Sequence, residues 1–169
     1  LTLKSGKTIE IVAVPGNHDC DFGDAHVRKI RSFLLDRINR KDVDGFDRDL
    51  VVEAMKPQTN YFDIAPKIHS LTDDDPLATY LQLNLGGRNV CFQLFNTAWI
   101  SELHEQPGHL CMPINLIADN PILGADLYVS LAHHPLHWLN ADNMVAFRNI
   151  LRKSSDIVLW GHEHLTDGI

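Results

Sequence analysis

Three short apolar runs of this sequence each stop at a histidine or just before one, and this repeated ending constrains the fold more than any other feature. The runs span residues 9–14 (IEIVAV), 126–132 (DLYVSLA) and 156–160 (DIVLW). They lead into the polar segments PGNHD (15–19), HHP (133–135) and GHEH (161–164). Short apolar runs that are rich in β-branched residues and bounded by Gly, Pro, Asn or Asp are typical of buried strands. We therefore predict three buried strands that end in polar side chains.

The segments between these runs predict helices. Apolar residues at helical spacing indicate a helix over 25–38, which Asp24 could cap, and a short helix is expected over 47–55. Another helix is expected over 140–153, with its inward face formed by Val145, Ile150 and Leu151. The rest of 41–75 is charged and predicts irregular structure.

A hairpin completes the predicted fold. Two strand-like runs, 78–85 and 89–95, flank the pair Gly86-Gly87, which is a hairpin signal. Strands that alternate with helices, together with one hairpin, predict the α/β class with a mixed sheet.

Charge and cysteine content narrow the classes of function. The net charge of −7 makes the chain a poor non-specific ligand of nucleic acid, so we expect no extended nucleic-acid groove. No apolar run is long enough to cross a membrane. The unclustered cysteines Cys20, Cys91 and Cys111 argue against a disulfide framework and against a structural zinc site, and they favour a reducing, cytoplasmic location.

The strand endings together predict a metal site. Functional sites of α/β sheets lie just beyond the carboxyl ends of strands, so the residues at these three ends could meet there. One histidine after a strand is usually a turn or surface residue, but three such endings in one chain are hard to explain in this way. Imidazole nitrogens with amide and carboxylate oxygens, and no thiolate, suit Mn, Fe, Zn, Ni or Co.

These motifs resemble those of the calcineurin-like metallophosphoesterases, a family of metal-dependent phosphatases. The last three ordered motifs of that family are Gly-Asn-His-Asp/Glu, a His in a His-x-Pro setting, and Gly-His-x-His. This chain carries them at 16–19, 133–135 and 161–164. The resemblance implies a layered β-sandwich of mixed sheets flanked by helices. It also implies that two divalent metal ions support the hydrolysis of a phosphate mono- or diester.

The resemblance also implies roles for single residues. Asn17, His133 and His162 would bind one metal ion, and His164 would bind the other. His134 would not be a ligand, because in an extended segment it would point away from His133.

The proton donor is implied in the same way. His18 would protonate the leaving oxygen, and Asp19 would orient His18.

Four aromatic or imidazole side chains near the motif strands could form a stacking wall for the substrate, although the two tryptophans could equally belong to the core. These residues are Phe22, Trp99, His137 and Trp138.

The first two motifs of the family, Asp-x-His and Gly-Asp-x-x-Asp, are absent here. Residues 23–26 (GDAH) imitate both, but they follow the Asn-His-Asp motif instead of preceding it, so capping of a helix is the expected role of Asp24. We therefore expect residues 1–169 to be the carboxyl-terminal portion of a metallophosphoesterase catalytic core, with its amino-terminal strands upstream. The whole protein would be a hydrolase, and this portion alone would be inactive. The alternative is a catalytically silent module that binds metal or a partner.

Overall fold

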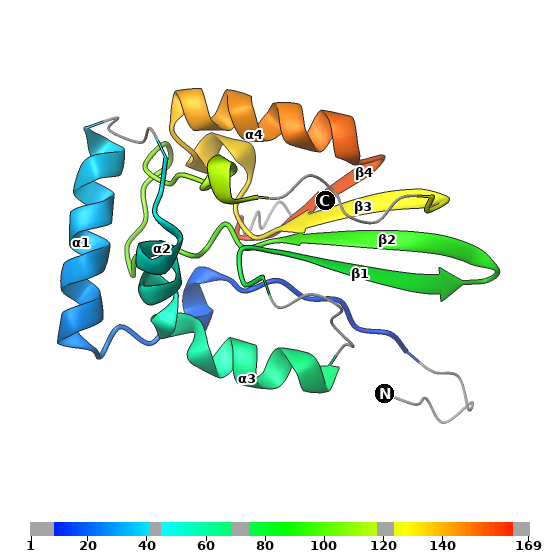
Figure 1. The fold of residues 1–169 in the computed structure, drawn as a ribbon, viewed down its shortest axis with the longest axis horizontal. Helices are drawn as coiled ribbons and strands as arrows, with labels where there is room; N and C mark the ends of the chain where they lie inside the picture. The colour runs from blue at the N-terminus through cyan, green and yellow to red at the C-terminus, as the bar shows by residue number, and fades with distance from the viewer. Residues whose placement is uncertain (1–8, 41–44, 69–74, 118–123, 164–169) are drawn as a thin grey trace, which may run out of the picture.

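A mixed sheet forms the centre of the part of the chain that the structure describes. The computed structural model describes residues 9–40, 45–68, 75–117 and 124–163. In these residues the strands β1 (Ala78–Leu85), β2 (Arg88–Phe95), β3 (Leu127–Ala132) and β4 (Ile157–Trp160) lie side by side in that order (Figure 1). β1 and β2 are antiparallel, whereas β2, β3 and β4 are parallel. The predicted α/β class with a mixed sheet is confirmed, and the described residues form one sheet rather than a sandwich of two.

The β1–β2 hairpin is confirmed at its turn. Gly86 and Gly87 have φ angles of 61° and 84°. Two successive residues with positive φ match the right-handed twist of the flanking strands, and glycine adopts this conformation without steric cost.

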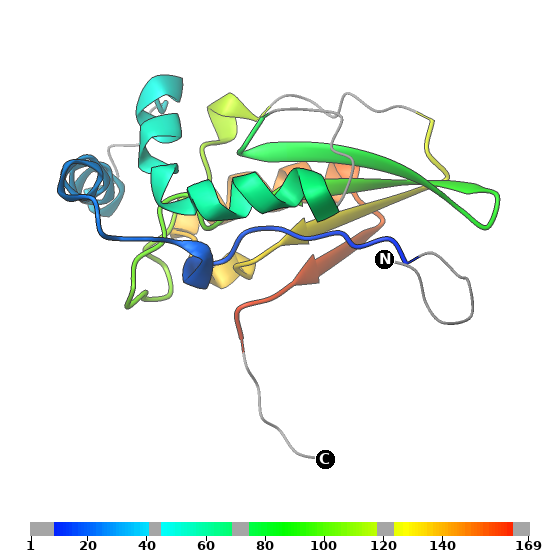
Figure 2. The same cartoon turned by 90° about the horizontal axis from the view of Figure 1, so that it is seen from below.

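Helices lie on both sides of the sheet. They are α1 (Ala25–Asn39), α2 (Arg48–Ala54), α3 (Thr59–Ile68) and α4 (Ala141–Ser154). Figures 1 and 2 place α4 on one side of the sheet and α3 on the other. The predicted cap is confirmed, because the Asp24 side chain accepts hydrogen bonds from the backbone N–H groups of His26 and Val27. The helix α3 lies in a segment that we expected to be irregular.

The inward face of α4 differs from the prediction. Phe147 and Leu151 are buried, whereas Val145 is 43% exposed. The Phe147 ring meets the ring of Phe95 on β2 edge-on, with centroids 5.2 Å apart. The inward stripe therefore runs through Asn143, Phe147 and Leu151 at four-residue spacing, and the expectation for Val145 was wrong.

Two of the runs that we expected to be buried strands are less buried than predicted. Residues 9–14 run alongside the sheet without joining it, so the prediction of a strand there was wrong (Figure 2). The Tyr61 hydroxyl donates a hydrogen bond to the carbonyl of Ala13 at 2.8 Å. β4 is the outer strand of the described sheet, with Ile157 and Leu159 exposed by 44% and 52%. Apolar composition indicates a strand, but burial also depends on which neighbours cover it.

A buried arginine fixes the loop after β2. The Arg31 guanidinium, on α1, donates to the carbonyls of Ala54, Trp99 and Ser101. Trp99 is fully buried and its indole N–H donates to the carbonyl of Cys111, so it is a core residue and not part of a substrate wall.

Candidate metal centre

The parallel pairing of β3 and β4 brings two of the motifs together. Ala132 pairs with Trp160 at the carboxyl ends of these strands, so His133 and Gly161 follow at the same edge of the sheet. The backbone N–H of Gly161 donates to the carbonyl of His133 at 3.1 Å. His133 and His162 therefore lie beside each other, as the strand endings predicted.

The remaining motif, residues 16–19, contacts His133 through Asn17. His133 Nε2 lies 3.0 Å from Asn17 Oδ1 and 3.0 Å from His162 Nδ1. Asn17 opens a short turn, η1 (Asn17–Asp19), that follows the buried Gly16. A Cβ atom on Gly16 would lie 2.7 Å from Cε1 of His133, so glycine is required for the turn to approach the ring this closely. Three of the predicted metal ligands thus converge.

The donor atoms of this cluster fit a divalent transition metal ion. Burial, aided by the positive charge that His134 and His162 can carry, lowers the pKa of His133 from 6.5 to about 4. The ring is therefore neutral at neutral pH and keeps a lone pair for coordination. Two imidazole nitrogens and an amide oxygen are a donor set that such ions accept.

His162 sits in a tight turn. Its φ angle is 67°, and the backbone N–H of Glu163 donates to the carbonyl of Gly161 at 2.8 Å. A hydrogen bond across three residues with positive φ at the centre is a strained γ-turn. The Glu163 carboxylate accepts from the indole N–H of Trp138 and contacts His137, which ties the turn to the short helix η4 (Leu136–Trp138). The Trp138 ring also packs against His162, with centroids 4.2 Å apart.

A comparison of the sequence with models of protein families shows the family of this chain. The family model described as calcineurin-like phosphoesterase matches residues 1–165. The chain belongs to this family. Calcineurin-like phosphoesterases are hydrolases of phosphate esters that depend on divalent metal ions. Comparisons with curated proteins and with solved structures gave no match. None of the helices in the described residues is long and apolar enough to cross a bilayer.

His134 lies inside the histidine cluster and does not point away from it, which corrects our expectation. Its ring centroid is 4.6 Å from that of His162. The expected alternation fails because β3 ends at Ala132, so His133 and His134 lie beyond the strand. That His134 is not a ligand stays a prediction. Its ring nitrogens lie 3.2 Å from Thr97 Oγ1 and 3.0 Å from Glu105 Oε2, and these protein partners support the prediction.

Glu105 is a residue of the site that the sequence did not indicate. Its side chain is only 2% exposed, and its Oε2 atom lies 3.0 Å from His134 Nε2 and 3.8 Å from His162 Nε2. Burial acts to raise the pKa of Glu105, but the hydrogen bond to His134 and the nearby histidine charges outweigh burial, and the pKa is lowered. Glu105 belongs to an irregular polar loop, and no spacing or motif in that loop distinguishes it from solvated neighbours.

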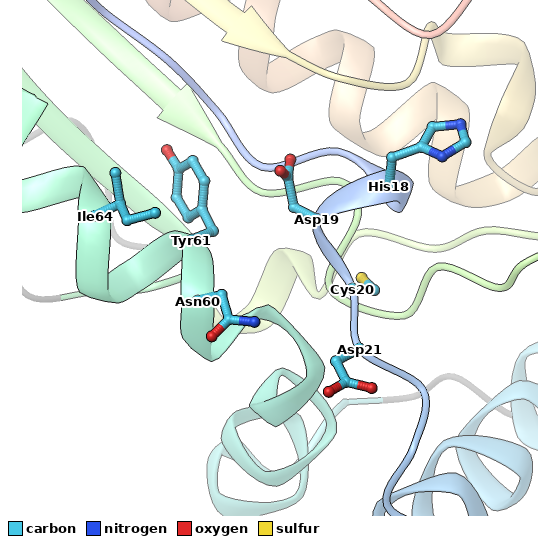
Figure 3. Close-up of a pocket in the computed structure, with 7 residues that line it drawn as sticks. All are labelled: His18, Asp19, Cys20, Asp21, Asn60, Tyr61 and Ile64. Atoms are coloured by element: carbon cyan, nitrogen blue, oxygen red, sulfur yellow. The ribbon is translucent and has the colours of Figure 1, made fainter.

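His18 and Asp19 lie on the η1 turn beside a pocket of about 380 Å³ (Figure 3). Both residues are exposed, and their side chains point in different directions. The Asp19 carboxylate accepts the backbone N–H of Gly16 at 2.8 Å and so closes the turn. Its expected action on His18 stays a prediction. Tyr61 of α3 forms the opposite wall of the pocket. His164, the expected ligand of a second ion, lies outside the described residues.

Proposed function

We propose that Asn17, His133 and His162 hold a divalent metal ion in a centre that hydrolyses phosphate mono- or diesters. The observation that supports this proposal is the convergence of Asn17 Oδ1 and His162 Nδ1 on His133 Nε2, each at 3.0 Å. His164 is proposed, from the family motif alone, as a ligand of a second ion. A cytoplasmic location is proposed from the cysteine content.

His18 is proposed as the proton donor of the reaction. Divalent ions in such centres supply Lewis-acid chemistry, which neutralises phosphate charge and makes water a better nucleophile. When water attacks phosphorus, the bond to the leaving oxygen breaks and that oxygen needs a proton. His18 follows Asn17 directly and its side chain is exposed, so it can reach a substrate held beside the metal ligands. A positioned proton donor typically contributes about 10²–10⁴-fold in rate.

Metal titration tests the ligand assignment. Asn17→Ala and His162→Ala should each weaken binding of Zn²⁺ or Mn²⁺, measured by calorimetry on the metal-free protein. His26→Ala is the matched control, because His26 is an exposed histidine of α1 outside the cluster, and it should bind metal like the wild type. If His26→Ala lost metal while His162→Ala kept it, the GDAH segment would be the metal site and this proposal would be wrong.

Leaving-group dependence tests His18. The His18→Ala variant should retain its metal content and lose about 10²–10⁴-fold in turnover of alkyl phosphate esters. Activated aryl esters should suffer far less, because their leaving oxygen scarcely needs a proton. Equal losses for both ester types, or loss of a bound ion, would remove His18 from this role.

A further inference from the structure

We propose that Glu105 is a positioning residue of the metal centre, which fixes the tautomer of His162 so that Nδ1 of that ring faces His133 and Asn17. The inference rests on the proposed metal-binding function of His162. Nothing in the sequence motifs assigns Glu105 a role.

The two nitrogens of His162 have different surroundings. Nδ1 lies 3.0 Å from His133 Nε2, inside the proposed ligand cluster, whereas Nε2 lies 3.8 Å from Glu105 Oε2. A neutral imidazole carries one N–H group, and a carboxylate favours the tautomer whose N–H faces it. Glu105 therefore favours the hydrogen on Nε2, and Nδ1 keeps the lone pair that a metal ion needs.

The burial of both side chains strengthens the electrostatic effect of the Glu105 carboxylate on His162. A separation of 3.8 Å is longer than a hydrogen bond, so the carboxylate acts on His162 through its charge. The side chains of Glu105 and His162 are only 2% and 13% exposed, and water screens such buried pairs weakly.

Glu105 is itself held in place. Its Oε1 atom accepts the backbone N–H of Glu102 at 3.3 Å, and its Oε2 atom accepts from His134 at 3.0 Å. The loop that carries it is tied to α1 by the hydrogen bonds of Arg31 to the carbonyls of Trp99 and Ser101. A buried carboxylate fixed on both oxygens is suited to orient a neighbour, as the outer carboxylates of metal-binding histidines do.

Glu105 could instead serve only to hold His134 in place, and a variant of Thr97 distinguishes this role from an action on His162. Thr97 Oγ1 contacts the His134 ring at 3.2 Å and accepts its backbone N–H at 2.9 Å. Thr97→Val therefore disturbs the seating of His134 without removing the carboxylate beside His162. If Glu105 serves only to seat His134, Thr97→Val and Glu105→Ala should have similar effects on metal binding.

The experiment compares Glu105→Ala, Glu105→Gln and Thr97→Val with the wild type. Zn²⁺ affinity is measured by competition with a chelator. The tautomer of His162 is read from two-bond ¹H–¹⁵N correlations in the metal-free protein. Glu105→Ala should bind Zn²⁺ about 10–100-fold more weakly, the usual effect of removing such a partner, and His162 should lose its uniform Nε2–H tautomer. Glu105→Gln should recover part of both, because its amide oxygen still accepts a hydrogen bond. Thr97→Val should stay near the wild type.

Four results would overturn the inference. Unchanged affinity and tautomer in both Glu105 variants would show that the carboxylate does not act on His162. An equal loss in Thr97→Val would assign the effect to His134. Loss of a whole ion in Glu105→Gln would make Glu105 a ligand. The wild-type protein showing no preference for Nε2–H at His162 would also contradict it. If Glu105→Ala does not fold, the Zn²⁺ affinity and the His162 tautomer of Glu105→Gln alone test the inference. If the wild type binds no Zn²⁺, the proposed metal-binding function is wrong, but the tautomer of His162 still tests the influence of Glu105.

Discussion

His162 occupies a backbone conformation that is unfavourable for a residue with a side chain. Its φ angle of 67° lies in the left-handed region, at the centre of a three-residue turn. Such conformations cost of order 1–3 kcal/mol each and persist where the surroundings impose them. The contacts of Trp138 with His162 and Glu163 are the surroundings that impose it here.

This strain predicts an unusual order of stability for two variants. His162→Gly should be more stable than His162→Ala by about 1 kcal/mol, because only glycine adopts the left-handed conformation without a Cβ clash. Urea unfolding of the metal-free proteins measures the difference. The two variants lose the same imidazole, so each serves as the control of the other. An alanine variant that equals or exceeds the glycine variant would show that the turn is not strained.

Tyr61 predicts a loss of stability at alkaline pH. Burial, followed by the charge of Asp19, raises the pKa of Tyr61 from 10.0 to about 12. Between these values the folded state keeps the phenol proton and the unfolded state releases it. The unfolded state thus binds fewer protons, so the free energy of unfolding falls as the pH rises from 10 to 12. Urea unfolding at several pH values should show a steeper fall for the wild type than for Tyr61→Phe. Parallel curves would contradict the assignment.

Site residues that belong to a sequence motif could be identified from the sequence. Site residues whose position depends on tertiary packing could not. Asn17, His133 and His162 follow apolar runs that stop abruptly, and the structure brings them together. Glu105 comes from a loop whose path depends on the buried Arg31, which lies on another element. The orientation of His134 was misjudged because the alternation rule ends where the strand ends.

At the scale of elements, α4 offers a direct test of which face is buried. Phe147 is fully buried against Phe95 of β2, so Phe147→Ala should lower the free energy of unfolding by about 3–5 kcal/mol through lost packing and a cavity. Val145→Ala, on the exposed side of the same helix, should change it by no more than about 0.5 kcal/mol. Chemical denaturation measures both. A larger loss for Val145→Ala would mean that the helix is rotated from the position described.

Elements with local signals were predicted from the sequence, whereas the helix α3 and the exposure of residues 9–14 and of β4 were not. The helix α1 has a capping aspartate, and the hairpin has two glycines that adopt positive φ. The helix α3 contains Pro66, which disfavours a helix in any reading of local pattern. Residues 9–14 and β4 have the apolar composition of buried strands, but their burial depends on the chain that packs beside them.

At the scale of the whole molecule, the proposed metal ligands come from distant parts of the chain. Asn17 and His133 are 116 residues apart, and His133 and His162 are separated by 29. The cluster therefore exists only after the sheet and the η1 turn have formed, and the unfolded chain offers no comparable site.

Metal should consequently raise the stability of the folded chain. At a free Zn²⁺ concentration of 100 times Kd, the gain should be about 2.7 kcal/mol, seen as a higher Tm in differential scanning calorimetry and reversed by a chelator. His26→Ala should respond as the wild type does, and His162→Ala should respond weakly or not at all. A Tm that is independent of metal in the wild type would contradict this linkage.

Because Asn17 and His133 are 116 positions apart in the sequence, an ion bound to both would act as a reversible cross-link. An ion held at both residues closes a long loop between them, and the entropy of that closure is lost from any state in which both contacts persist. Opening of either segment must then release the ion first, which suppresses the partly open forms that proteases cut. Metal supply would in this way set the lifetime of the protein as well as its activity.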